Sequence, residues 1–90
     1  MATESEGLLA VEGDITITTY SSKLDFFRSN VSDKTSLIDF SKVEYVDSAA
    51  IALMIECIRF SGRPFRFRGL PESLENLISL YGVGDIVHRT

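Results

Sequence analysis

Asp47 and Ser48 are the residues whose types and spacing point most directly to chemistry. They stand in SKVEYVDSAAIALMIECIRF, residues 41–60, where a strand-like run ends and a long apolar run begins with two alanines. An acid followed by a hydroxyl at such a junction could be a catalytic elbow, a site for a phosphate group, or a helix cap.

The enzymatic interpretation lacks the other groups that it needs. A serine nucleophile requires a base within hydrogen-bond reach, and the only imidazole is that of His88, near the end of the chain. The local sequence VDSAA is not the G-x-S-x-G of a hydrolase elbow, and no phosphate-binding G-x-x-x-x-G-K occurs. No cluster of cysteine and histidine offers a metal site. We therefore expect no enzymatic activity, no metal and no cofactor.

The two remaining interpretations rest on the start of a helix. Either Asp47 or Ser48 can accept hydrogen bonds from the free backbone N–H groups there. A phosphate on Ser48 would also be favoured, because those N–H groups and the positive end of the helix dipole would face it. The sequence alone is consistent with a plain cap and with a phosphorylation switch.

The elements that must position this pair alternate between strand and helix. Hydrophobic periodicity and turn residues predict three strands, within residues 7–15, at 36–40 and at 64–68. The second of these continues at 43–46 after a turn at Ser41-Lys42. Three helices are predicted between and after the strands, from a cap at Thr16 or Thr18 to Asn30, from Ser48 to about Phe60, and from Pro71 to Gly82. This order predicts an α/β domain with mostly parallel strands, whose sheet is covered well on one face and poorly on the other.

The predicted helix after Ser48 has one unusual face. Ala49, Ala52, Glu56 and Arg59 recur along it at spacings of three and four residues, while the other positions are apolar and should pack on the sheet. Two interpretations remain open. The face is either a solvated surface of small, helix-favouring residues or a surface that another protein approaches closely.

Two further features have structural explanations. Cys57 is the only cysteine, so no intrachain disulfide can form, and its place on the Ser48 helix predicts a buried or half-buried thiol. Arg66 and Arg68 alternate with Phe65 and Phe67, so we expect these arginines, together with Arg63, on the more exposed face of the sheet.

Length and charge limit the remaining classes. Ninety residues make one domain, 1–90, in which residues 1–6 are either disordered or a rudimentary edge strand. A net charge of −4 argues against nucleic acid. The polar N-terminus does not resemble a secretory signal, and no apolar run is long enough for a membrane span. We expect a soluble, cytoplasmic protein without direct membrane insertion.

The segment LIDFSKVEYVDSAAIALMIECIRFSG resembles the signature of STAS domains, the fold of bacterial anti-sigma-factor antagonists. Gly13-Asp14-Ile15 resembles the Gly-Glu-Leu that precedes the first helix in that family, and Ser48 falls on its phosphorylatable position. The ending LPESLENLISLYGVGDIV is similar to one branch, the small MlaB-like STAS subunit of Mla-type ABC transporters, which move phospholipids between bacterial membranes.

The resemblance implies a STAS-like domain with a mixed sheet of four or five strands and three or four helices. It also implies a non-catalytic, cytoplasmic interaction subunit that binds and supports the transporter's ATPase and so lies at the inner face of the membrane through the transporter complex. The expected partner surface consists of Asp47, Ser48, Ala49, Ala52, Glu56 and Arg59. The alternative is an anti-sigma-factor antagonist whose Ser48 is phosphorylated by an anti-sigma kinase. Antagonists often continue Asp-Ser with Ser-Gly or Thr-Gly, whereas this chain has Ala49-Ala50, which favours the transporter branch.

Overall fold

The computed structural model describes residues 7–89, with the side chains of the last two left out, and contains four strands and three helices in that range. The chain order is strand β1 (Leu8–Ile15), helix α1 (Tyr20–Asn30), β2 (Leu37–Val46), α2 (Ala49–Ser61), β3 (Arg66–Arg68), α3 (Glu72–Tyr81) and β4 (His88–Arg89). The predicted α/β class, the STAS-like order of elements and the position of the central helix are confirmed. The rudimentary strand proposed for residues 1–6 lies outside the described residues.

The strands form one sheet in the order β1-β2-β3-β4, and each neighbouring pair is parallel. The prediction of a mixed sheet is therefore wrong for the described strands. Each connection between consecutive strands contains one helix, which is α1, α2 or α3. Such a crossover brings the chain back to the sheet in the same direction, so the strands are parallel.

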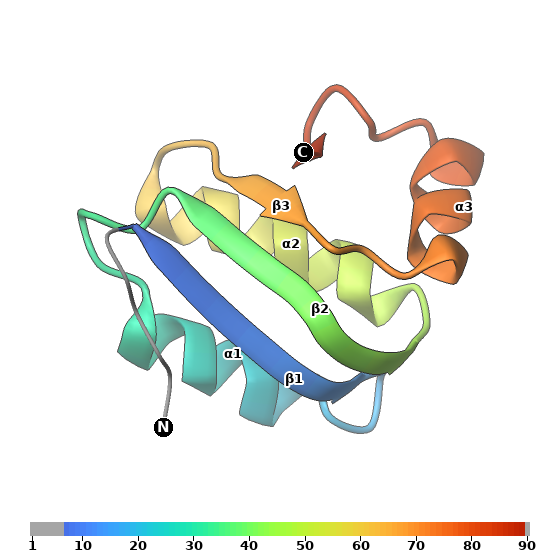
Figure 1. Cartoon of the computed structure of the whole chain (residues 1–90), viewed down its shortest axis with the longest axis horizontal. Coiled ribbons are helices and arrows are strands. Elements are labelled where there is room, and N and C mark those ends of the chain that lie inside the picture. The colour runs from blue at the N-terminus through green and yellow to red at the C-terminus, as the bar shows by residue number, and fades with distance from the viewer. Residues whose placement is uncertain (1–6, 90) are drawn as a thin grey trace.

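Helices α1 and α2 lie side by side behind the strands in Figure 1, and α3 contacts α2 beyond β3. Alternate strand residues follow this layering. Leu9 and Ile38 point into the core, whereas Arg66 and Arg68 are exposed on the other face. No helix of the described chain covers β1 and β2 on the face toward the viewer, as the sequence predicted. Arg63 departs from the prediction, because its guanidinium donates hydrogen bonds to the backbone oxygens of Ser32 and Thr35.

The predicted turn at Ser41-Lys42 is instead part of one continuous strand. The pairing of β1 with β2 slips by one residue twice, first between Ala10 and Glu12 and again between Gly13 and Ile15. Such bulges bend a strand without ending it. At the first slip, the carboxylate of Asp39 accepts hydrogen bonds from the backbone N–H of Ser41 (3.0 Å) and from its hydroxyl (2.6 Å). The polar pair thus stabilises a bulge rather than a turn.

Gly69, which follows β3, packs directly on this bulge. Its φ is +68°, and a Cβ there would lie 2.9 Å from both Ser41 N and Asp39 Oδ1. Gly62 has a similar φ of +73°, but a Cβ at that position would meet nothing within 4 Å.

We expect Gly69→Ala to lower the free energy of unfolding more than Gly62→Ala does. Both substitutions cost about 1 kcal/mol for the left-handed backbone. Gly69→Ala adds the displacement of the Asp39–Ser41 bulge, for a total of about 2 kcal/mol. Urea unfolding of the two variants measures the difference, and equal losses would show that the bulge yields at no cost.

Candidate functional site

The site is the junction between β2 and α2, and Asp47 determines its geometry. One carboxylate oxygen, Oδ1, accepts a hydrogen bond from the backbone N–H of Ala49 at 2.8 Å, which satisfies a free donor in the first turn of the helix. The other, Oδ2, accepts one from the backbone N–H of Ile17 at 3.0 Å. Asp47 therefore joins the start of α2 to the loop that precedes α1.

The loop on the other side of this contact is itself ordered by hydrogen bonds. The hydroxyl of Thr19 donates to the carbonyl oxygen of Asp14 at 2.8 Å and accepts from the N–H of Thr16 at 3.0 Å. Thr19 also occupies the N-cap position of α1, so the predicted caps Thr16 and Thr18 are wrong. Residues 16–19 form a turn, closed by the hydrogen bond from Thr19 N–H to the carbonyl oxygen of Thr16, and helix α1 begins directly after it at Tyr20.

Ser48 is the N-cap residue of α2 by position, but its hydroxyl caps nothing. The side chain is exposed and makes no cap hydrogen bond, while its carbonyl oxygen accepts from the N–H of Ile51 at 3.1 Å. The capping role therefore belongs to Asp47, one of the two residues that the sequence left open. The Ser48 hydroxyl remains available to an incoming group.

The other predicted partner residues divide into exposed and buried members. Ala52 and Arg59 are exposed on α2 and Glu56 is half-buried, as the helical spacing predicted. Ala49 is only 8% exposed, so its predicted place on the surface is wrong. Its neighbour Ala50 is fully buried as well, so the first turn of α2 is covered over a wider part of its circumference than the helical spacing indicated.

Ile17 is a candidate site residue that sequence reasoning missed. Its side chain is 77% exposed, although it is a large apolar residue, and its backbone is fixed beside Asp47. Four other large apolar side chains are also exposed, namely Tyr45, Leu80, Tyr81 and Ile86, and Ile17 is distinguished from them by its hydrogen bond to the residue that caps α2. The signal in the sequence was a single isoleucine within the hydroxyl-rich run TITTYSS, where an apolar residue has no evident packing role.

Cys57 lies on the opposite side of α2, within the core, and does not belong to the site. The residue is fully buried, as predicted, and its hydroxyl-bearing neighbour Ser61 donates to its carbonyl oxygen. Burial raises the pKa of the Cys57 thiol to about 12, and the charge of Arg63 lowers it only in part. At neutral pH the thiol is therefore protonated and unreactive.

We expect iodoacetamide to alkylate Cys57 at pH 8 at least about a hundredfold more slowly in the folded chain than in the unfolded chain. The reason is that the thiolate fraction falls steeply when the pKa lies several units above the pH, and burial also blocks access. Mass spectrometry of samples taken with and without denaturant gives both rates. Rapid labelling of the native protein would contradict the buried position.

The described residues contain no group of three or more histidine, cysteine, aspartate or glutamate side chains that could hold a metal ion. Within the same range, none of the helices has both the length and the apolar character that a bilayer crossing requires. What the junction offers is a surface, with a hydroxyl, a small residue and an apolar side chain fixed around one helix start.

This arrangement of a parallel sheet, one helical layer and an acid–hydroxyl pair at the start of the central helix is that of a STAS domain. The profile of a family described as "Mlab, STAS domain" matches residues 1–88. The chain therefore belongs to the MlaB-type STAS family. The comparison with curated protein sequences found no match.

A search of solved structures supports the fold. A candidate anti-sigma factor antagonist from Thermotoga maritima, known from its crystal structure, superposes with a TM-score of 0.76 and 18% sequence identity. The match covers 99% of this chain and 83% of the other. At this identity the likeness establishes a shared fold and leaves the partner of this chain open.

Proposed function

We propose that the chain is a non-catalytic subunit that binds and supports the ATPase of an Mla-type phospholipid-transport ABC system. The observation that carries the proposal is the exposed start of α2. Ser48 and Ala52 leave the helix backbone open to close approach, while Asp47 fixes the backbone of Ile17 beside the start of α2. The match to the family described as "Mlab, STAS domain" supports this proposal.

On this proposal the chain works in the cytoplasm, at the inner face of the membrane, through its contact with the transporter. It performs no chemistry of its own, and ATP is bound and hydrolysed by the partner. The contact surface comprises Ser48, Ala52, Glu56 and Arg59 from the predicted set, with Ile17 added and Asp47 holding the two segments in place.

The direct test is ATP hydrolysis by the purified ATPase–permease complex with and without the added chain. We expect the chain to raise the hydrolysis rate or to increase the amount of intact complex, and the isolated chain to hydrolyse no ATP. A complex that assembles and turns over equally well without the chain would argue against this function.

An anti-sigma-factor antagonist is the second candidate, and one observation favours it. The Ser48 hydroxyl is exposed at a helix start, where the positive end of the helix dipole favours the negative charge of a phosphate. This alternative predicts that incubation with an anti-sigma kinase and ATP adds the mass of one phosphate, and that Ser48→Ala abolishes the addition. Absence of the mass gain with a kinase that binds the chain would remove the candidate.

A further inference from the structure

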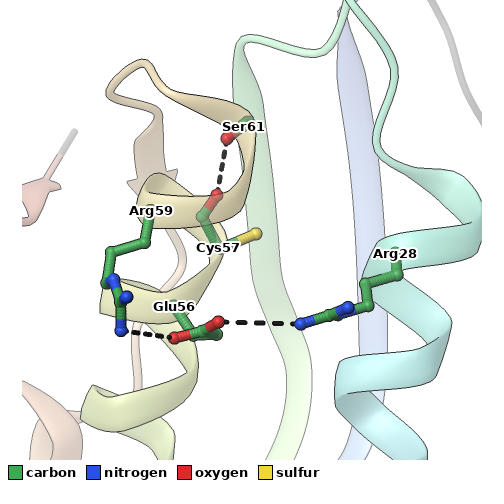
Figure 2. Close-up of polar contacts among 5 residues, drawn as sticks. All are labelled: Arg28, Glu56, Cys57, Arg59 and Ser61. Atoms are coloured by element: carbon green, nitrogen blue, oxygen red, sulfur yellow. Dashed lines mark hydrogen bonds and ion pairs between the residues drawn. The ribbon is translucent and has the colours of Figure 1, made fainter.

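Three charged side chains form a row across the exposed surface of α1 and α2. Glu56 lies between Arg28 and Arg59 in Figure 2, with its Oε2 3.7 Å from Arg28 Nη2 and its Oε1 3.4 Å from Arg59 Nη1. The glutamate side chain is 26% exposed, whereas the arginine side chains are 56% and 74% exposed. The row therefore presents its positive members to solvent.

The row can bind a partner group that accepts hydrogen bonds, but it has few acceptors left for a partner group that donates them. Each carboxylate oxygen of Glu56 is already paired with an arginine. A guanidinium carries five N–H donors, and each of these ion pairs joins Glu56 to one guanidinium nitrogen. Two arginines against one glutamate also leave an excess positive charge here, in a chain whose net charge is −4. An incoming group of matching chemistry is a carboxylate, which a guanidinium binds in a planar, two-pronged geometry.

The two arginines differ in how freely they can move to a partner. Arg28 also lies over the ring of Phe60, with its Cζ 5.5 Å from the ring centroid, so two contacts hold it. Arg59 pairs with Glu56 three residues earlier on the same helix, an arrangement of low energy at an exposed position. Arg59 can therefore turn toward a partner at little cost.

The row continues the surface proposed above. Ser48, Ala52, Glu56 and Arg59 follow one face of α2 at spacings of four, four and three residues, which span about 16 Å at the helical rise. A partner segment that approaches closely at Ser48 and Ala52 would reach the arginines within three turns.

We propose, resting on the function proposed above, that the Arg28–Glu56–Arg59 row docks an acidic segment of the protein partner, with Arg59 as the principal contact. The small side chains of Ser48 and Ala52 determine how closely the partner approaches at one end of the surface. The charged end fixes the direction in which the partner segment lies along α2, because reversing it would place its carboxylates at Ser48 and Ala52.

The test measures the affinity of the partner that the tagged chain captures. Arg59→Glu is expected to weaken binding about tenfold or more, and Arg59→Gln by a smaller factor. Arg66→Glu is the matched control, because it changes the net charge equally at an exposed arginine on the opposite face of the sheet, and it should leave binding unchanged. Raising the salt so that the Debye length falls from about 30 Å to about 8 Å should weaken wild-type binding more than Arg59→Gln binding.

The outcomes separate this inference from the function on which it rests. If Ser48→Arg abolishes ATPase binding while Arg59→Glu matches Arg66→Glu, the acidic-segment inference is wrong and the proposed function stands. If the captured partner is a kinase, the proposed function is wrong, and the same three variants decide the inference with that kinase. Capture of no partner overturns both.

A membrane is the other anionic surface that arginines could bind. Sedimentation with vesicles of phosphatidylcholine and phosphatidylglycerol tests it directly. We expect the chain to stay in the supernatant. Sedimentation that Arg59→Glu abolishes and Arg66→Glu leaves intact would replace the acidic protein segment by lipid headgroups and overturn the inference.

Discussion

Ser48→Arg is expected to weaken ATPase binding by at least about a hundredfold while the fold and its stability stay unchanged. The serine side chain is exposed and makes no cap hydrogen bond, so its replacement removes no internal contact. A long charged side chain at this position would prevent the close approach that Ser48 and Ala52 otherwise permit. Isothermal titration or surface binding with the purified ATPase gives the dissociation constants.

Two variants make this result interpretable. Ala52→Arg places the same bulk one turn further along the exposed face and should cause a loss of similar size. Ser79→Arg places it at an exposed serine in the last turn of α3 and should bind normally. Thermal unfolding of all three chains checks that each remains folded. Unchanged binding by Ser48→Arg would exclude the start of α2 as the contact surface.

Asp47→Ala is expected to lower the free energy of unfolding by about 2 kcal/mol and to weaken partner binding about tenfold. The stability loss has two sources, since the Ala49 N–H loses its cap and the Ile17 N–H loses a charge-assisted partner, each worth about 1 kcal/mol. The binding loss follows because Ile17 is no longer held beside Ser48. Urea unfolding and the same titration give the two quantities.

Asp47→Asn is the matched control for this pair of effects. The amide keeps one acceptor oxygen and replaces the other with a donor, so one of the two bonds survives. We therefore expect about half of the stability loss. If Asp47→Ala and Ile17→Ala each leave binding at the wild-type value, the loop before α1 does not belong to the partner surface, whatever the stability change.

Local sequence patterns predicted the helix boundaries and strand faces around the site well, because these features depend on residues that are close in the sequence. The change from strand-like to helix-like periodicity at Asp47-Ser48 placed the start of α2 correctly, and Gly62 and Gly82 ended the helices at the predicted positions. The alternation of Phe65 and Phe67 with arginines gave the two faces of β3, since successive strand residues point to opposite sides.

Features that depend on contacts between distant segments were outside the reach of those patterns. Ile17 reaches the site through a hydrogen bond to a residue thirty positions later. Ala49 is buried by the packing of the first turn of α2, which helical spacing alone does not predict. Arg28 joins Glu56 only because α1 packs beside α2. At Ser41-Lys42 the sequence is compatible with a turn and with a bulge, and only the pairing of β2 with β1 distinguishes the two.

The central claim is that the start of α2 binds a transporter ATPase, and affinity capture from the native host tests it most directly. The tagged wild-type chain and its Ser48→Arg variant are compared, and mass spectrometry identifies what each retains. The account predicts an ABC ATPase with its permease on the wild-type chain and their loss from the variant. An anti-sigma kinase in place of the ATPase, or an ATPase retained equally by both chains, would contradict it.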